Sequence, residues 1–385
     1  MDFELSSEQK MWQRSVRDFC DAEVKPYAAE VDATSTLHWD AIRKMLPLGL
    51  LSLEAPEAYG GAEMDSISTV LALEELGRAC GSTALSVTAH NGLGCAPLRT
   101  WGTPEQQARW FPSLLDGAHL GSLALTEPQA GSDLLGGLQT TATLDGDHWV
   151  IQGSKAWITN AGIAPVITVL VKTGASGGSR DFSMILVDAQ TPGLTIHPPE
   201  KKMGLQGSPT HMLSFEGARV PAESLLGAEG EGFYQTMQTL DSGRIGIGAI
   251  SLGLAQAALE EGVRYAQGRR AFGKAISEHQ AIQWMIADAA LEIEAARLLV
   301  YKAAWLKDQG RDYGKLAAMG KLMASETAEK VARDAIQIHG SYGYSREFPV
   351  ERIYRDQRLM TIGEGTSEIQ RMVIARRVLK ELSAE

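Results

Sequence analysis

The segment Thr141-Ala-Thr-Leu-Asp-Gly-Asp-His-Trp-Val-Ile-Gln152, near the middle of the chain, decides the fold class. Two short runs rich in Thr, Val, Ile and Trp flank the dipeptide Asp145-Gly146, which is typical of a hairpin turn because glycine tolerates a positive φ. Further strand-like runs follow at residues 166–173, 181–189, 195–197 and 211–215. We therefore predict a central β-barrel-like domain over residues 121–228.

The residues before this region have helical patterns. Ser6 and Gln9 have the spacing of a capping box, and apolar residues then recur on one helical face until Pro26. Thr103-Pro104-Glu105-Gln106 predicts another helix start, with proline at the first helical position. We predict an N-terminal helical domain over residues 1–120.

The residues after the β region are also helical, in longer pieces. Residues 278–309 and 315–339 carry alanine-rich helical patterns with broad apolar faces, and Gly340 has the position of a C-cap. Such faces favour packing in a bundle, either within one chain or between subunits. The fold class is thus multidomain α and β, with a C-terminal four-helix-bundle-like domain over residues 229–385.

Composition narrows the function classes. The chain has 385 residues and a formal net charge of −11, which argues against nucleic-acid binding because phosphates require a basic face. Three widely spaced cysteines predict reduced thiols, not a disulfide framework. The first residues lack the pattern of a signal peptide, and no apolar run approaches the ~18 residues that span a bilayer. We expect a soluble cytoplasmic protein.

Several short motifs resemble known functional motifs but lack the residues or the neighbouring secondary structure that those functions require. Gly268-Arg-Arg-Ala-Phe-Gly-Lys274 resembles a phosphate loop, but Ala275 replaces the Ser or Thr that ligates Mg²⁺, and a helix precedes it. Gly174-Ala-Ser-Gly-Gly178 lies between two predicted strands, whereas a nucleophile elbow needs a strand followed by a helix. No Gly-x-Gly-x-x-Gly follows a strand, and the eight histidines have no metal-ligand spacing. We expect neither nicotinamide binding nor a metal site.

Four segments, far apart in the sequence, form a pattern together. They are Leu125-Thr-Glu-Pro-Gln-Ala-Gly-Ser-Asp133, Lys155-Ala-Trp-Ile-Thr-Asn160, Arg269-Arg-Ala-Phe-Gly-Lys274 and Glu364-Gly-Thr-Ser-Glu-Ile-Gln-Arg371. In this order and spacing they resemble the acyl-CoA dehydrogenase family, and the resemblance extends over nearly the whole chain. It implies a flavoprotein that uses FAD to convert an acyl-CoA thioester into the trans-2-enoyl-CoA.

Glu364 is the candidate catalytic base. Removal of a proton α to a thioester needs a carboxylate whose pKa is raised towards neutrality by an apolar pocket, and Gly365 lets the backbone approach a ligand. The alternative is a solvated glutamate in a loop. The resemblance implies Glu364 as the base, the flavin N5 atom as hydride acceptor, and the backbone N–H of Gly365 as a contact of the thioester carbonyl. A minority branch of the family places the base at a position that is Gly243 here.

The resemblance also implies binding roles for other residues. Asp241 and Arg244 would contact the substrate, as would Ser132; an intrahelical ion pair is an equally good interpretation of Asp241 and Arg244. The FAD contacts would come from Leu123, Leu125, Thr126, Gly131, Ser132, Trp157, Ile158, Thr159, Arg269, Phe272, Gln280, Gln337, Gly340, Thr366 and Glu368. Arg269, Phe272 and Gln280 would reach the FAD of a neighbouring subunit, so a homotetramer is expected. The expected electron acceptor is an electron-transferring flavoprotein.

The sequence departs from the family pattern at two positions. Gly363 stands where many relatives carry a tyrosine, which predicts a wider acyl pocket that tolerates branched or bulky chains. Ser341 replaces a common glycine near Gln337. An acyl-CoA oxidase and a catalytically silent acyl-CoA-binding relative are the alternative functions. The intact set of Glu364, Thr159 and Arg269 argues against a silent protein.

Overall fold

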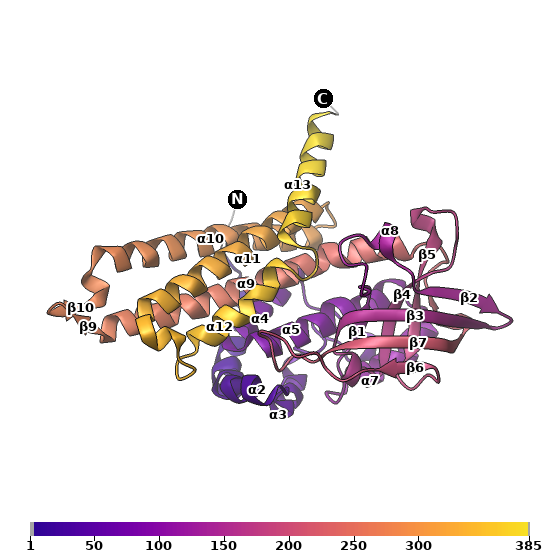
Figure 1. Ribbon diagram of the computed structural model, residues 1–385, viewed down its shortest axis with the longest axis horizontal. Coiled ribbons are helices and arrows are strands. Elements are labelled where there is room, and N and C mark those ends of the chain that lie inside the picture. Colours follow the sequence, from indigo (N-terminus) through magenta and orange to yellow (C-terminus); the bar gives the residue numbers. More distant parts are fainter. Residues whose placement is uncertain (1–3, 384–385) are drawn as a thin grey trace.

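The computed structural model describes residues 4–383 and begins with helices (Figure 1). Ser6 and Thr103 cap the first and the last helix of this part, each in a capping box with the glutamine three residues later, as predicted. The first helix ends earlier than predicted, because a π-turn over Cys20–Val24 and a 3₁₀ turn over Lys25–Tyr27 follow it. The N-terminal helices are α1 (Ser7–Phe19), α2 (Ala28–Thr34), α3 (Trp39–Lys44), α4 (Ser66–Ala79), α5 (Gly81–Thr88), α6 (Ala96–Trp101) and α7 (Pro104–Leu114).

An eight-stranded, mostly antiparallel sheet follows, in the order β6-β7-β3-β2-β4-β5-β8, with β1 parallel to β4. The predicted hairpin over residues 141–152 is β2 and β3, with Asp145 paired to His148. Ile151, Val169 and Phe215 pack in the core of this sheet with no exposed surface. The strands are β1 (Ser122–Ala124), β2 (Thr141–Asp145), β3 (His148–Thr159), β4 (Val166–Lys172), β5 (Phe182–Asp188), β6 (Leu194–Ile196), β7 (Thr210–Pro221) and β8 (Leu225–Leu226), with the short helix α8 (Leu134–Gly137) between β1 and β2.

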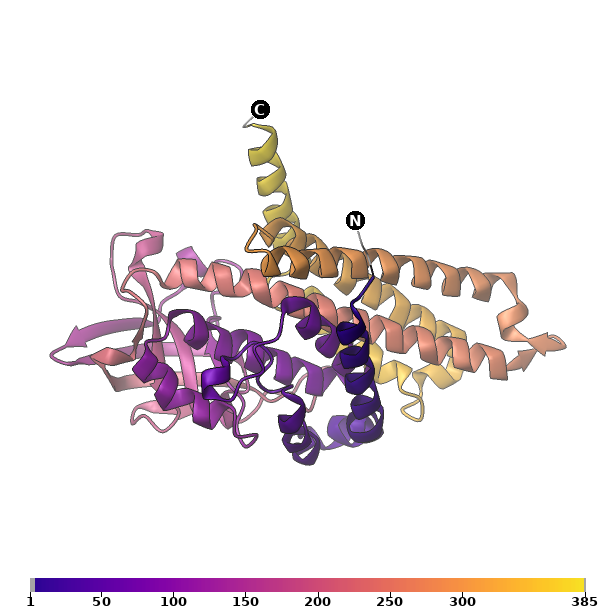
Figure 2. The ribbon, with the colours of Figure 1, turned by 180° about the vertical axis from the view of Figure 1, so that it is seen from behind.

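Three long helices then run side by side away from the sheet, and α13 projects from them (Figures 1 and 2). The longest, α9, has 37 residues and spans roughly 55 Å at 1.5 Å per residue. It joins the sheet to the small hairpin of β9 and β10, which lies at the opposite end of the molecule (Figure 1). The elements of this part are α9 (Gly232–Gly268), β9 (Arg270–Ala271), β10 (Lys274–Ala275), α10 (Gln280–Asp308), α11 (Gly314–His339), α12 (Val350–Gln357) and α13 (Ser367–Leu382).

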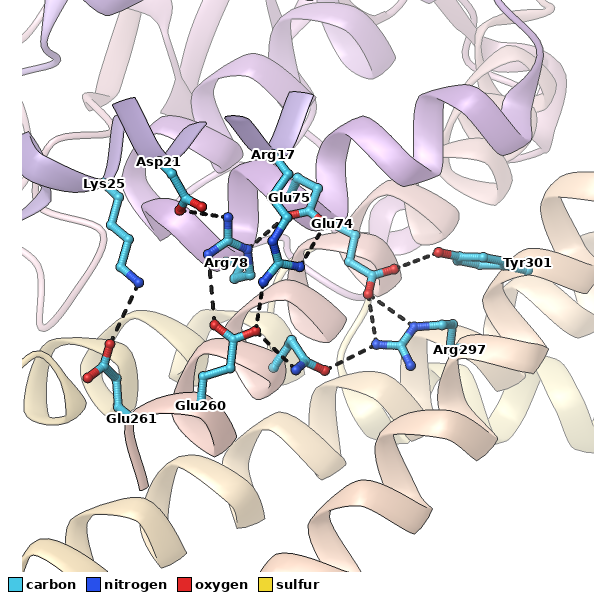
Figure 3. Close-up of polar contacts among 11 residues, drawn as sticks. Arg17, Asp21, Lys25, Glu74, Glu75, Arg78, Glu260, Glu261, Arg297 and Tyr301 are labelled. Atoms are coloured by element: carbon cyan, nitrogen blue, oxygen red, sulfur yellow. Dashed lines mark hydrogen bonds and ion pairs between the residues drawn. The ribbon is translucent and has the colours of Figure 1, made fainter. Parts of the chain in front are cut away.

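The helix α4 packs closely against α9. A Cβ added to Gly253 would lie 2.1 Å from the Glu74 carbonyl oxygen, so only glycine allows the two backbones to approach this closely. Around this crossing, charged side chains from α1, α4, α9 and α10 bond to one another (Figure 3). Arg17 Nη2 of α1 donates to Glu260 of α9 at 3.1 Å, and the Arg297 guanidinium of α10 donates to Glu74 of α4 at 2.9 Å. The N-terminal helices are thereby fixed to the long helices.

Within residues 4–383, every helix is too short or too polar to cross a membrane. Cys20, Cys80 and Cys95 are buried free thiols, as predicted.

Candidate active site

Glu364 lies in the short turn between the 3₁₀ turn Arg358–Thr361 and α13. Its backbone has a left-handed φ of +51°, and Gly365 follows with φ +95°. Thr366 caps α13 by accepting a hydrogen bond from the Ile369 N–H at 3.3 Å, and Glu368 lies exposed in the first helical turn. A positive φ at a non-glycine residue is strained, and such strain is concentrated at functional sites.

The Glu364 carboxylate points at α9. Its Oε2 atom is buried and has no hydrogen-bond partner. A Cβ added to Gly243 would lie 1.9 Å from this oxygen, so the carboxylate fills the space that a side chain at position 243 would take. Burial raises the pKa of Glu364 to about 7, while the charges of Lys321 and Arg244 act in the opposite direction. The site thus contains a carboxyl group that titrates near neutral pH.

Arg244 lies next to this carboxylate on α9. It is buried, donates to Asp241 one turn earlier, and leaves its Nε atom without a partner. Burial raises the pKa of Asp241, against the opposing charges of Arg244 and Arg377. The intrahelical ion pair is therefore present, and the substrate contact of these two residues stays a prediction.

Two side chains that the sequence analysis did not single out hold the backbone of this turn. Lys321 Nζ donates to the Gly365 carbonyl at 2.8 Å, and Gln370 Nε2 donates to the same oxygen at 2.8 Å and to the Glu364 carbonyl at 3.2 Å. Lys321 shares the buried face of α11 with small residues at helical spacing, Ala317, Ala324 and Ala328. A lysine among buried alanines is a pattern that could have identified it.

The end of strand β3 presents Trp157 and Thr159. The pairing of β3 with β7 shifts register between Lys155 and Ile158, and within this irregularity Trp157 adopts φ +62° with 60% of its surface exposed. Ile158 is buried, and Thr159 is half-buried. An exposed indole held in a strained backbone conformation is suited to cover a planar ring.

The segment over residues 123–132 lies beside this strand end. The Ala156 N–H donates to the Thr126 carbonyl at 2.9 Å, and the buried Lys155 ammonium donates to the Leu125 carbonyl at 3.0 Å and to Glu127 at 2.9 Å. Leu123 is buried and Leu125 is half-buried, whereas Gly131 and Ser132 are exposed. The structure thus brings together the predicted cofactor residues of the β domain.

The remaining predicted cofactor residues lie elsewhere. Arg269 follows the end of α9, Phe272 forms the tip of the β9–β10 hairpin with 95% exposure and φ +52°, and Gln280 starts α10. The stacking of Tyr265 on His339, with ring centroids 4.2 Å apart, brings the end of α11 to the same place. Gln337 and Gly340 are exposed there. Because this end and the sheet lie at opposite ends of α9, one chain does not unite these residues with Trp157 (Figure 1).

Residues 4–383 contain no cluster of three or more His, Cys, Asp or Glu side chains that could hold a metal ion.

Comparison with known proteins identifies the family. Three family models match in succession: acyl-CoA dehydrogenase N-terminal domain at residues 6–118, middle domain at 122–218 and C-terminal domain at 230–379. The chain belongs to the acyl-CoA dehydrogenase family. It is 50% identical to a "probable acyl-CoA dehydrogenase", YngJ, of Bacillus subtilis, over 99% of this chain and 100% of the relative. It is 45% identical to the mitochondrial short-chain specific acyl-CoA dehydrogenase of Bos taurus, over 98% and 91% of the two chains.

Solved structures of the family agree with this fold. Butyryl-CoA dehydrogenase of Megasphaera elsdenii has a TM-score of 0.95 and 39% identity, covering 98% of this chain and 100% of that one. A chain in a structure described as the electron transferring flavoprotein of Acidaminococcus fermentans has a TM-score of 0.95 and 41% identity, with 98% and 100% coverage. An acyl-CoA dehydrogenase complexed with FAD from Bacillus anthracis has a TM-score of 0.91 and 34% identity, covering 99% of this chain and 69% of that one.

As a member of this family, the chain is an oxidoreductase with FAD as its cofactor. The described residues fit this cofactor. Trp157 and Phe272 offer uncovered aromatic surface at strained positions, and an added Cβ at Gly131 would meet no heavy atom within 4 Å, which leaves its backbone open to a ligand.

Proposed function

We propose that this chain catalyses the α,β-dehydrogenation of an acyl-CoA thioester to the trans-2-enoyl-CoA, with Glu364 as the base. The observation that carries the proposal is the buried Glu364 Oε2 atom, which has no hydrogen-bond partner and belongs to a carboxyl group whose pKa is raised to about 7. Uptake of a proton by a carboxylate in this state is favourable, because burial destabilises the ionised form. The raised pKa also matches the operating pH of a cytosolic enzyme.

Glu364 takes the α-proton of the substrate, so the α C–H electron pair becomes the new double bond while the β-hydrogen leaves as hydride. Bound FAD supplies the hydride acceptor at its N5 atom. The Gly365 N–H would donate to the thioester carbonyl, where it would stabilise the negative charge that develops as the proton leaves. Asp241, Arg244 and Ser132 would bind the rest of the thioester.

Trp157, Ile158, Thr159 and the residues 123–132 would hold the flavin ring. The ring would lie against the exposed Trp157 indole, and the half-buried Thr159 would offer a hydrogen bond near N5. The Arg269 guanidinium, with five donors in a fixed fork, is suited to the pyrophosphate. Phe272, Gln280, Gln337 and Gly340 would contact the adenosine half, and Thr366 and Glu368 would complete the site.

Cofactor binding in this arrangement requires a second subunit, and we propose a homotetramer. The two sets of FAD residues are separated by the length of α9, roughly 55 Å, so one FAD must contact two chains. The surface of α10 offers a matching interface, because Trp284, Leu291, Leu298 and Trp305 recur every seven residues with 46–69% of their surface exposed. Leu291→Arg should therefore dissociate the oligomer, as measured by light scattering, and the same variant should release FAD. Dissociation with full retention of FAD would contradict the shared site.

The substrate is proposed to be a short acyl group, as in the names of the bovine and Megasphaera relatives, with tolerance of branching. The three heavy atoms nearest to a Cβ added at Gly363 all belong to Leu359, at 3.6–3.8 Å, so this position leaves room beside the Glu364 turn. Gly363→Tyr should lower kcat/KM for branched thioesters by roughly tenfold relative to straight short ones, as expected for a filled apolar pocket. Equal losses for both classes would contradict a role of Gly363 in selection.

The flavin absorbance tests the function directly. Anaerobic titration of the yellow protein with a panel of saturated acyl-CoAs should bleach the absorbance with short thioesters, and Glu364→Gln should prevent bleaching while keeping the colour. Reoxidation of the bleached protein should be faster with an electron-transferring flavoprotein than with O₂; the reverse order would favour an oxidase. A yellow protein that no thioester bleaches would move the function to another flavin reaction or to binding alone.

A further inference from the structure

Lys321 is a buried cation without an ion pair. Its side chain has no exposed surface, and among residues 4–383 no carboxylate oxygen lies within 4.0 Å of its Nζ atom. The other fully buried lysine, Lys155, has the Glu127 carboxylate 2.9 Å from its ammonium group. A buried ammonium group without such a partner is costly, so its retention requires a specific interaction.

The ammonium group of Lys321 acts on the Glu364 turn. Its hydrogen bond ends on the Gly365 carbonyl oxygen at 2.8 Å, the same oxygen that accepts from Gln370 Nε2 at 2.8 Å. The two donors come from different helices, α11 and α13, and they fix the same carbonyl group. This carbonyl belongs to Gly365, which, like Glu364 before it, has a positive φ. They differ in charge, because the amide of Gln370 is neutral. Fixing the backbone in this way holds the base in place, since displacements of about 1 Å are enough to slow catalysis.

The charges around Lys321 come from three helices and the turn. Arg244 of α9 repels it, whereas Glu364 across the turn, Glu326 on its own helix and Glu368 at the start of α13 attract it. Burial lowers the pKa of Lys321 to about 8, and Glu364 is the largest of the opposing influences. Arg244 is already paired with Asp241, so Lys321 is the nearby cation that forms no ion pair of its own within the described residues.

We propose that Lys321 is a positioning residue for proton abstraction, whose ammonium group fixes the Glu364–Gly365 backbone and favours the ionised carboxylate. The inference rests on Glu364 as the base. It assigns Lys321 two separable effects: the hydrogen bond sets the geometry of the turn, and the charge sets the pH at which the base becomes active.

The test compares the pH dependence of the flavin-bleaching rate in four FAD-loaded variants. Lys321→Met removes the hydrogen bond and the charge; it should lower the limiting rate roughly tenfold and move the midpoint of the acid limb upward by roughly half to one unit. Gln370→Leu removes a neutral donor to the same oxygen, so it should lower the rate without moving the midpoint. Lys330→Met, on the same helix and ion-paired with Glu292, should change neither quantity. Lys321→Arg keeps the charge and should keep the wild-type midpoint.

An unchanged midpoint in Lys321→Met, or a shift of equal size in Gln370→Leu, would overturn the proposal. If Lys321→Met does not retain FAD, Lys321→Arg decides, because a shifted midpoint with the charge retained contradicts the role of that charge. Glu364→Gln is measured alongside. Activity in that variant would refute Glu364 as the base, whereas an inactive Glu364→Gln with an unaltered Lys321→Met would refute only the role of Lys321.

Discussion

Two half-buried glutamates of this chain, Glu54 and Glu364, have opposite properties. Burial by itself raises the pKa of Glu54, but the charges of Lys307 and Arg99 and their hydrogen bonds hold it below its usual value. Lys307 Nζ donates to both carboxylate oxygens at 2.7 and 2.9 Å, and Arg99 Nη1 donates at 2.8 Å. Glu364 also has two cations nearby, but they bond to a backbone carbonyl and to Asp241, not to the Glu364 carboxylate.

The comparison shows that the number of nearby cations does not decide the state of a buried carboxyl group. Direct charge-assisted hydrogen bonds do, because they compensate the desolvation of the ionised form. Glu54 is thereby a structural anion that joins α6 to α10, whereas Glu364 is a carboxyl group that titrates near neutral pH.

Of the substitutions that test this contrast between Glu54 and Glu364, Gly243→Ala is expected to have the largest effect. Alanine is the better helix former by about 1 kcal/mol, so α9 should tolerate it. Its Cβ would lie 1.9 Å from the Glu364 Oε2 atom, which must move. We expect kcat to fall by roughly 100-fold with FAD still bound. Gly262→Ala on the same helix, where the nearest heavy atom lies at an ordinary 3.4 Å, is the matched control. An active Gly243→Ala would place the base elsewhere.

Glu54→Gln should affect stability and not chemistry. The change leaves Lys307 and Arg99 without their anion, and loss of one partner of a largely buried pair costs about 2–3 kcal/mol of unfolding free energy. Because the pKa of Glu54 is lowered in the fold, the stability it contributes is present above the pKa of the unfolded chain, 4.5, and is lost as the pH falls below it. Urea unfolding at pH 7 and at pH 4 measures this. A kcat reduced as strongly as in Gly243→Ala would contradict the assignment.

Glu364→Gln should have the opposite effect on stability. The folded pKa of about 7 lies above the value of 4.5 in the unfolded chain, so ionisation of Glu364 opposes folding as the pH rises from 4.5 through 7. Glutamine has no such cost, and the variant should gain about 1–2 kcal/mol at pH 8 and almost nothing near pH 4.5. Urea unfolding of the FAD-loaded proteins at both pH values checks this. If Glu364→Gln were less stable than the wild type at pH 8, interactions with its surroundings would have to compensate the desolvation of the Glu364 carboxylate.

Local patterns predicted much of the fold. The capping boxes at Ser6 and Thr103, the hairpin over residues 141–152 and the C-cap at Gly340 each depend on residues a few positions apart, and all are confirmed. The turn of the hairpin lies one residue later than predicted, at Gly146-Asp147, because Asp145 still pairs with His148. The helix α9 was not predicted as one continuous element. Its glycines weaken the helical pattern, and the reason for them, such as the close contact of Gly253 with Glu74, is a tertiary one.

In the candidate site, too, the sequence predicted local features but not those that depend on tertiary contacts. The position of Glu364 on a short turn was predicted from its own sequence. Lys321 was not identified as a donor to this turn, because it lies 44 residues from Gly365 in the chain. Gln370 lies only five residues from Gly365, but it was not singled out either. The left-handed backbone of Trp157 was not predictable either, since the irregular pairing with β7 produces it. The separation of Arg269 from Trp157 depends on the unbroken length of α9, and only the three-dimensional arrangement reveals it (Figure 1).

The central claim is that the uncompensated carboxyl group of Glu364 is the base. The most direct measurement is the rate of anaerobic flavin bleaching by a short acyl-CoA between pH 5 and pH 9, which follows the step that needs the ionised base. The account predicts an acid limb with a midpoint near 7, because the pKa of Glu364 is raised to about 7 by burial. A midpoint near the ordinary glutamate value of 4.5, or a rate independent of pH over this range, would contradict it.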